Sequence, residues 1–231
     1  MDKRKLLAIG ITIIFLITPI VLLRATTVST PKFSLSKPLR VACVGDSITE
    51  ITSYTSDLQT MLGTNYSVNN FGVTGSTVSL DSYKPYIQQQ AFQKAENYEP
   101  NIVVIMLGTN DAHSYLEQYN ETFEQDYTKL THSFQELDSK PQIFIVESPP
   151  VFNNSLGLDP TFFSDTIIPH IQNVADTQNL SAVDVYDAFG NQSNYTVDGV
   201  HPNDEGSTLI ASQVCDAITL QDDSGSNNPA S

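Results

Sequence analysis

Basic residues are scarce in this chain of 231 residues. Lysine and arginine total 11 against 26 aspartate and glutamate residues, which gives a formal net charge of −15 at pH 7. A surface of this sign repels phosphate groups, so the composition argues against docking to nucleic acid or to an anionic lipid surface. Solubility is the simplest role for such a surface.

Cysteine is also scarce, with only Cys43 and Cys215. Two cysteines are too few for a disulfide framework, and their spacing is not that of a metal site. Cys43 lies in an apolar run that we expect to be a buried strand. We therefore expect two buried thiols and no metal; a single bridge is the alternative, because an exported domain would permit one.

Nucleotide-binding signatures are missing as well. Neither G-x-G-x-x-G nor G-x-x-x-x-G-K-[ST] follows the first apolar run of the globular part, which argues against a nucleotide-binding α/β domain. The chain has no internal repeat and, within the globular part, no long apolar lid that would shelter a fatty chain.

The N-terminal segment differs from everything after it. Three basic residues lie within residues 1–5, and residues 6–23 carry no charge. A spanning helix needs roughly 17–25 apolar residues, whereas the core of a cleaved signal has about 7–15. We expect a transmembrane signal anchor, with a cleaved signal and secretion as the alternative. The basic residues should stay cytoplasmic, which places the following domain on the extracellular or lumenal side.

Asn-x-Ser/Thr sequons are somewhat more frequent than chance would give. Six of them begin at Asn65, Asn120, Asn153, Asn179, Asn191 and Asn194. If the source is eukaryotic, this number is consistent with a glycosylated lumenal domain.

The rest of the chain alternates between apolar runs and segments with helical spacing. The apolar runs cover residues 39–45, 66–71, 101–107, 142–146 and 181–186, and the helical segments cover residues 54–62, 83–98, 123–137, 160–178 and 203–220. Continuous apolar runs are typical of parallel strands buried on both faces. The pattern predicts an α/β fold: a three-layer α/β/α sandwich with a central five-stranded parallel sheet over residues 39–220. Residues 24–38 read as a linker, and residues 221–231 as a disordered acidic and polar tail.

Chemically useful residues follow four of the five predicted strands. Ser47 follows the first strand. A turn that contains Gly72 and Gly75 follows the second strand, and Asn110 follows the third. Asp198-Gly199-Val200-His201-Pro202 follows the fifth strand, just before the last helix. Because ligands bind at the carboxyl ends of parallel strands, we expect all of these residues to meet at one edge of the sheet.

Their chemistry suggests a role for each. A serine hydroxyl becomes a nucleophile only beside a base, and His201 is the histidine expected at this edge, since His132 and His170 fall within helices. Asp198 can orient the His201 ring. The backbone amides of Ser47 and Gly75 and the side-chain amide of Asn110 can supply an oxyanion hole.

Each motif alone has a simpler explanation. Gly-Asp-Ser is an ordinary turn and helix cap, and Gly72-x-x-Gly75 is more often turn geometry than catalysis. Asn110 and Asp111 could cap the following segment, and Asp198 to Pro202 could be a loop with proline at a helix start. The order and placement of all four motifs together argue against these explanations.

The four motifs resemble those of the SGNH hydrolase superfamily, the GDSL lipases and esterases. The resemblance covers residues 39–220: Gly45-Asp46-Ser47 for the nucleophile, Gly75 (with Gly72 as the alternative) and Asn110 for the oxyanion hole, and Asp198 and His201 for the remaining catalytic residues. It implies a flavodoxin-like sheet and hydrolysis of esters through an acyl-enzyme, with no cofactor or metal. Some members of the superfamily depend less on the acidic residue beside the catalytic histidine, which makes Asp198 the weakest assignment. His113 is expected to be a surface residue, with a place in the pocket as the alternative.

The substrate is the less defined part of this resemblance. It is nearest to small-substrate members that act on acetylated sugars, which implies a short-acyl carbohydrate esterase. A lysophospholipase or thioesterase is the alternative, and a catalytically silent, membrane-tethered glycan-binding module is a third possibility. In each case the partner is a small molecule or a glycan.

Overall fold

The computed structural model describes residues 37–226 of the chain. The basic N-terminus, the predicted span at residues 6–23 and most of the linker lie outside the described residues. Within residues 37–226, no helix is long and apolar enough to cross a membrane. The signal anchor and its cleaved alternative therefore stay predictions.

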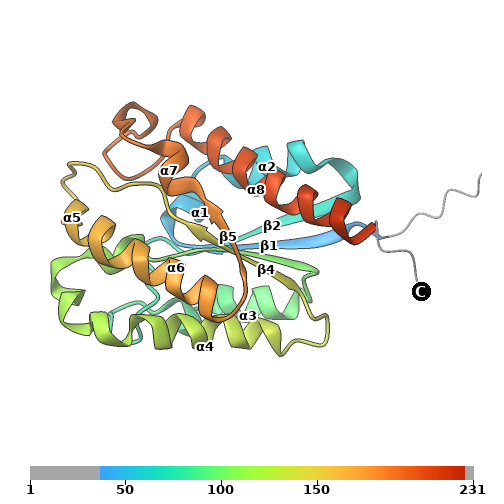
Figure 1. Ribbon diagram of the computed structural model, residues 1–231, viewed down its shortest axis with the longest axis horizontal. Helices are drawn as coiled ribbons and strands as arrows, with labels where there is room; N and C mark the ends of the chain where they lie inside the picture. Colours follow the sequence, from blue (N-terminus) through green and yellow to red (C-terminus); the bar gives the residue numbers. More distant parts are fainter. Residues whose placement is uncertain (1–36, 227–231) are drawn as a thin grey trace, which may run out of the picture. The chain divides into compact units, whose positions relative to one another are not determined.

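The centre of the described domain is a sheet of five strands, all parallel. The strands lie in the order β2-β1-β3-β4-β5, and Figure 1 shows them running through the middle of the domain. Their bounds are β1 (Leu39–Gly45), β2 (Tyr66–Gly72), β3 (Ile102–Met106), β4 (Gln142–Glu147) and β5 (Ser181–Asp184). The predicted three-layer α/β/α fold and its five-stranded parallel sheet are confirmed.

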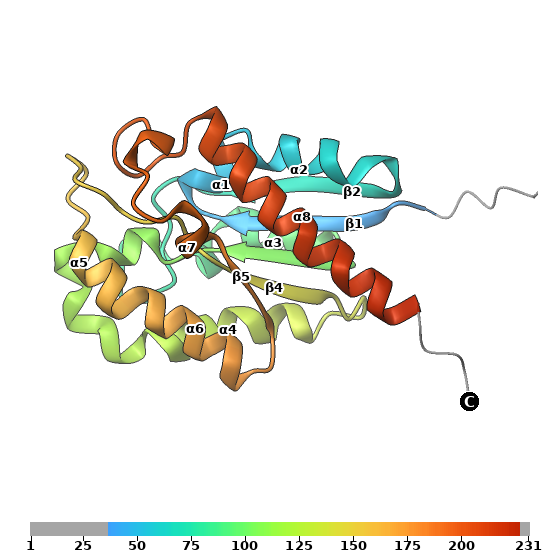
Figure 2. The same ribbon diagram turned by 45° about the horizontal axis from the view of Figure 1, so that its top comes forward.

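Helices cover both faces of the sheet. One layer contains α3 (Gln90–Asn97), α4 (Phe123–Gln135), α5 (Pro160–Phe162) and α6 (Ile168–Thr177). The other contains α1 (Ser47–Ile51), α2 (Tyr54–Leu62), α7 (Val185–Phe189) and α8 (Asp204–Ser226). Figures 1 and 2 show α2 and α8 side by side on one face and α4 and α6 side by side on the other.

Alternate residues of each central strand enter different cores. In β1, Ala42 and Val44 belong to the core beneath α3, α4 and α6, whereas Val41 and Cys43 belong to the core beneath α2 and α8. All five residues of β3 are buried. This burial on both faces explains why the sequence shows continuous apolar runs and no alternation there. The edge strands β2 and β5 are only partly buried, as their weaker apolar pattern suggests.

Two predicted helices are interrupted. Over residues 83–98 the structure has an irregular segment, a short 3-10 turn and then α3, because backbone hydrogen bonds tie Thr77 to Lys84 and Tyr86. Over residues 160–178 a π-helical turn at Phe163–Ile167 separates α5 from α6. Pro169 lies just after this turn; its ring and missing N–H disfavour regular α-helical hydrogen bonding, which a widened turn relieves.

Two other boundaries differ from expectation. The strand predicted to reach residue 186 ends at Asp184, because the Asp184 carboxylate accepts a hydrogen bond of 2.8 Å from the Asp187 amide and starts α7. The backbone of α8 continues to Ser226, beyond the expected start of a disordered tail at residue 221. Polar residues do not by themselves end a helix, and the first glycine after Leu220 is Gly225.

Both cysteines are free thiols. Cys43 is buried in β1, and burial raises the pKa of its thiol to about 12. Cys215 on α8 is only partly buried. The expectation of two separate thiols is confirmed, but that of burial holds fully for Cys43 alone.

Candidate active site

Ser47 lies where β1 turns into α1. Asp46 caps this helix, and its carboxylate accepts a hydrogen bond of 2.9 Å from the Ile48 amide. Ser47 is therefore the first residue of α1, at the carboxyl end of a central strand. Burial raises the pKa of the Asp46 carboxyl to about 6, although the Ile48 amide works in the opposite direction.

His201 joins Ser47 to Asp198. The Nε2 atom of His201 lies 2.9 Å from the Ser47 Oγ atom, and its Nδ1 atom lies 2.7 Å from the Asp198 Oδ2 atom. The other carboxylate oxygen of Asp198 accepts hydrogen bonds from the backbone amides of Val200 and His201, at 3.0 and 2.8 Å. The loop before α8 thus fixes the carboxylate and the ring as one unit facing Ser47.

The charge of Asp198 favours one tautomer of His201. Burial alone would raise the pKa of the Asp198 carboxyl, but hydrogen bonds from the His201 ring and from the two backbone amides hold the pKa below its ordinary value. An ionised Asp198 accepts a hydrogen bond from Nδ1–H, so the Nε2 atom of a neutral ring is left as an acceptor for the Ser47 hydroxyl. A serine next to a free imidazole nitrogen can be activated for nucleophilic attack.

A pocket of about 190 Å³ opens above Ser47 and is called the small pocket below. Ser47, Gly75, Asn110 and His201 all contribute to its lining. The remaining lining residues are Thr74, His113, Leu156, Leu158 and Val200. Together with Asp198, which holds His201, the residues predicted at the sheet edge are therefore brought together.

Gly75 and Gly72 have different surroundings. Gly75 has φ +74°, lines the small pocket, and within the described part of the chain its amide has no acceptor. The Gly72 amide instead donates a hydrogen bond of 2.9 Å to the side chain of Asn70. A Cβ atom at Gly72 would approach the Glu50 amide nitrogen to 2.3 Å, so this glycine serves close packing against α1. Of the two, Gly75 is the one placed to bind an oxyanion.

Asn110 and Asp111 hold the loop after β2 against the turn after β3. The side-chain amide of Asn110 donates to the Ser76 carbonyl at 3.0 Å and, over a longer 3.3 Å, to the Asp46 carboxylate. Asp111 is buried and accepts from the Val78 and Ser79 amides, each at 2.9 Å. Burial raises the pKa of Asp111 to about 7 against the effect of these amides, and the nearby Asp46 raises it further.

This role of Asp111 was not found from the sequence. The simpler explanation, that Asn110 and Asp111 cap the following segment, is wrong for Asp111, whose carboxylate binds amides 32 and 33 positions away in the chain. An acidic residue five positions after a fully apolar strand is the only sequence signal for such a buried contact, and it does not identify the partner.

His113 lines the small pocket, which corrects the expectation of a surface histidine. Its Nδ1 atom lies 3.1 Å from the Gly157 carbonyl oxygen, and residues 113 and 158 form an isolated β-bridge. This pairing folds the loop after β4 across the small pocket and brings Leu156 and Leu158 into its wall. His170 is elsewhere, in α6, where its Nδ1 atom lies 2.5 Å from a Glu124 carboxylate oxygen.

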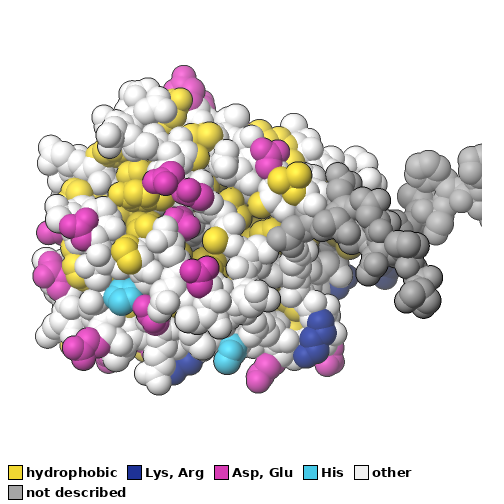
Figure 3. Space-filling view, viewed as in Figure 1, with side chains coloured by type: hydrophobic (Ala, Val, Ile, Leu, Met, Phe, Trp, Pro, Cys, Tyr) yellow, Lys and Arg dark blue, Asp and Glu magenta, His cyan; other side chains and the backbone are white. Residues whose placement is uncertain are grey.

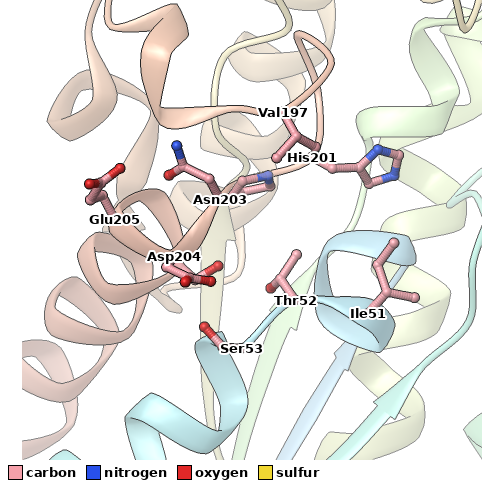
Figure 4. A pocket seen from close by; sticks show the side chains of 10 residues that line it. Ile51, Thr52, Ser53, Val197, His201, Asn203, Asp204 and Glu205 are labelled. Atoms are coloured by element: carbon pink, nitrogen blue, oxygen red, sulfur yellow. The ribbon is translucent and has the colours of Figure 1, made fainter.

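A second and wider hollow of about 710 Å³ adjoins His201 and is called the wide hollow below. It lies between α1 and the start of α8, and Figure 4 shows its labelled side chains arranged around the space between these elements. Its lining consists of Ile51, Thr52, Ser53, Val197, His201, Pro202, Asn203, Asp204, Glu205 and Ser207. Because both spaces include His201, this side chain lies between them.

A metal site is not found in the described part of the chain. No group of three or more His, Cys, Asp or Glu side chains between residues 37 and 220 is arranged to hold a metal ion. The sequons, for their part, begin at exposed asparagines except for Asn120, which is partly buried. Glycosylation stays a prediction.

Comparisons with known proteins agree with this geometry. Residues 43–209 match the model of the GDSL-like Lipase/Acylhydrolase family. An acetylxylan esterase of Xylanibacter ruminicola is 31% identical over 206 residues, which cover 78% of this chain and 43% of the relative. The chain therefore spans less than half the length of that relative.

Similar solved structures include two carbohydrate esterases. Est24, a carbohydrate acetylesterase from Sinorhizobium meliloti, has 20% identity and a TM-score of 0.63, over 79% of this chain and 99% of its own. A carbohydrate esterase family 3 structure from Talaromyces cellulolyticus has 22% identity and a TM-score of 0.61, over 80% and 99% of the two chains. At these identities the likeness shows a shared fold.

Proposed function

The chain belongs to the GDSL-like lipase/acylhydrolase family and is an ester-bond hydrolase, and from this premise we propose that it removes short acyl groups, acetyl above all, from carbohydrates. The observation that carries the proposal is the hydrogen-bonded series Asp198–His201–Ser47 at the wall of a small pocket. The names of the acetylxylan esterase relative and of the similar carbohydrate esterases support the sugar ester.

The mechanism in this proposal has two stages. In the first, His201 takes the proton of Ser47 as its Oγ atom attacks the ester carbonyl, and then gives that proton to the departing alcohol oxygen. In the second, His201 takes a proton from water as that water attacks the acyl-enzyme, and returns the proton to the Ser47 Oγ atom as the C–O bond breaks and the acid leaves. The Ser47 and Gly75 amides bind the oxyanion that forms in each stage, together with the Asn110 side-chain N–H that, without substrate, reaches Asp46 over 3.3 Å.

The size of the small pocket favours a short acyl group. Its volume is about 190 Å³, which also has to contain the reacting carbonyl, and Leu156, Leu158 and Val200 limit it on the apolar side. A long fatty chain would have to extend beyond this wall. The lysophospholipase or thioesterase alternative therefore has no feature of the described domain in its favour.

The test is hydrolysis of p-nitrophenyl acetate, butyrate and octanoate by the full chain and by Ser47→Ala. Losing the nucleophile should remove the acyl-enzyme burst and lower kcat by on the order of 10⁴–10⁶-fold. Ser56→Ala, an exposed serine on α2, is the matched control and should behave as wild type. Unchanged activity of Ser47→Ala would overturn the mechanism, and a preference for octanoate would overturn the short-acyl substrate.

The cellular location of the enzyme is a further part of the proposal. Residues 6–23 would anchor the chain in a membrane, with the catalytic domain outside the cell or in a lumen, as the uncharged segment and the basic residues before it suggest. Protease added outside intact cells should then degrade the catalytic domain, and the mature chain should keep its N-terminus. A mature chain that begins after residue 24 would indicate a cleaved signal and a secreted enzyme.

A further inference from the structure

The two spaces on either side of His201 differ in shape and in chemistry. The small pocket contains the oxyanion donors Gly75 and Asn110 and is walled by leucine and valine side chains. The wide hollow is several times larger and contains neither Gly75 nor Asn110. A bound ester has an acyl group and an alcohol group on opposite sides of its carbonyl carbon, so the two parts of the substrate have different places available.

The proton path and the position of the oxyanion donors together decide which part goes where. When the Ser47 Oγ–C bond forms and the C–O bond to the alcohol breaks, the proton from Ser47 passes through His201 Nε2 to the departing oxygen. The departing oxygen must therefore come within hydrogen-bond reach of the His201 ring. The carbonyl oxygen meanwhile points to the Gly75 and Asn110 donors.

From this geometry we propose that the wide hollow binds the alcohol part of the substrate, and that the small pocket binds the acyl part. The proposal rests on the catalytic roles assigned above to Ser47 and His201. It makes Ile51, Val197, Asp204 and Glu205 determinants of alcohol specificity, and Leu156 a determinant of acyl specificity.

The lining of the wide hollow fits a neutral sugar. Ile51 and Val197 are large apolar side chains that remain 62% and 71% exposed, and they offer a surface to the C–H face of a sugar ring. Asp204 and Glu205 are exposed, and among the described residues their carboxylates have no partner, so they can accept hydrogen bonds from sugar hydroxyls. Figure 4 shows these four side chains around the hollow.

The charge of the wide hollow disfavours a phosphate-bearing alcohol. Its lining, all of it within the described residues, contains two carboxylates and no lysine or arginine. In the space-filling view of Figure 3, acidic side chains are spread over the face, whereas most of the visible lysine and arginine side chains gather towards its lower right edge. A phosphate group in the hollow would meet like charge without a compensating partner.

The first experiment compares two series of esters with the full chain. One series keeps the acetyl group and changes the alcohol, from p-nitrophenol to acetylated methyl xyloside. The other keeps p-nitrophenol and changes the acyl group, from acetate to octanoate. For each variant the measured quantities are the ratios of kcat/KM within a series, because such ratios cancel any loss of active enzyme.

Variants of the two spaces should affect different ratios. The double variant Asp204→Asn/Glu205→Gln should lower the xyloside-to-nitrophenol ratio by about three- to ten-fold, as expected for lost hydrogen bonds to sugar hydroxyls, and leave the acyl ratios unchanged. Leu156→Ala should raise the octanoate-to-acetate ratio by roughly the same factor and leave the alcohol ratio unchanged. Met61→Ala, an exposed apolar residue on α2, is the control.

The second experiment tests the charge of the wide hollow. Acetyl transfer from p-nitrophenyl acetate to an added alcohol, in competition with water, should occur with methyl xyloside and glycerol and be at least about three-fold weaker with glycerol 3-phosphate. Asp204→Lys/Glu205→Lys should raise transfer to glycerol 3-phosphate relative to glycerol by about ten-fold or more.

The outcomes separate this inference from the proposed function. If Ser47→Ala keeps full activity, the catalytic roles fail and the inference fails with them. If Ser47→Ala is inactive but the wide-hollow variants change the acyl ratio, or change neither ratio, the assignment of the two spaces is overturned and the mechanism stands. If Asp204→Lys/Glu205→Lys changes acetyl transfer to glycerol 3-phosphate and to glycerol by the same factor, the charge argument is overturned.

Discussion

The side-chain amide of Asn110 donates a hydrogen bond of 3.0 Å to the backbone carbonyl of Ser76. This bond joins the turn after β3 to the loop after β2, next to Gly75. It fixes the direction of the Asn110 nitrogen before any substrate binds. Donors that are oriented in advance stabilise an oxyanion without reorganisation during the reaction.

Asn110→Ala should therefore affect the chemical step more than substrate binding. Removing one oxyanion donor lowers kcat by about 10²–10³-fold in comparable sites, and we expect KM to change little. Steady-state kinetics with p-nitrophenyl acetate would measure both, and a melting curve would check that the loop remains folded. An unchanged kcat with a raised KM would mean that Asn110 binds the ground state instead.

Asp198→Asn tests how far catalysis depends on the carboxylate that is hydrogen-bonded to His201 in the series Asp198–His201–Ser47. Asparagine keeps the size of the side chain but can donate to Nδ1 and so favours the wrong tautomer of His201. We expect kcat to fall by about 10²–10⁴-fold, less than for Ser47→Ala. A fall as large as that of Ser47→Ala would make Asp198 indispensable, and a fall of less than about ten-fold would make the enzyme a Ser–His pair.

The residues that local sequence could predict are those at the ends of strands. The buried strands were clear because β1, β3 and β4 are apolar on both faces, and their order placed Ser47, Gly75, Asn110 and His201 at one edge. The spacing of apolar residues could not show the π-helical turn before Pro169, because the buried residues Phe163, Ile167, Ile171 and Val174 follow one another at the three- and four-residue spacing of an ordinary α-helix.

The contacts that sequence could not predict connect loops that are distant along the chain. Asp111 binds amides of the loop after β2, and His113 meets Gly157 of the loop after β4. Neither partner has a spacing or a composition that marks it. The wall of the small pocket is built from such contacts, which is why the reaction type was easier to predict than the substrate.

Gly72→Ala and Gly75→Ala should differ in what they lose, because the first should mainly lower stability and the second should mainly lower activity. At Gly72 a Cβ atom would come within 2.3 Å of the Glu50 backbone nitrogen, so the loop or α1 must shift and stability should fall by on the order of 1–3 kcal/mol. At Gly75 a Cβ atom would meet nothing within 4 Å, but its φ of +74° is strained for alanine, at a cost of about 1–2 kcal/mol.

Thermal melting and kinetics together distinguish the two glycines. Gly75→Ala should lose more activity than stability, because a relaxed backbone would turn its amide away from the small pocket. Gly72→Ala should lose stability and keep most of its activity per folded molecule at low temperature. The reverse result would mean that Gly72 supplies the oxyanion amide.

The pH dependence of stability should depend on Asp111. Burial raises the pKa of Asp111 to about 7 in the folded protein, well above the value of an unfolded aspartate. The folded state therefore binds this proton more tightly, so the contribution of Asp111 to stability is complete below about pH 4 and is lost as the pH rises through about 7. Asp198 acts in the opposite sense, but its lowered pKa places its effect in more acidic solution.

We thus expect Asp111→Asn to be less stable than wild type at pH 5, since asparagine can accept only one of the two amide hydrogen bonds. The difference in free energy of unfolding between wild type and Asp111→Asn should narrow by on the order of 1–3 kcal/mol between pH 5 and pH 8, because only the wild type loses the bound proton over this interval. Urea unfolding at several pH values would measure it. Asp126→Asn is the matched control, a buried carboxylate that accepts from the Leu80 amide and pairs with Lys129 at 2.9 Å. If the gap for Asp111→Asn stays constant or widens with pH, Asp111 is already ionised at pH 5 and its hydrogen bonds outweigh its burial.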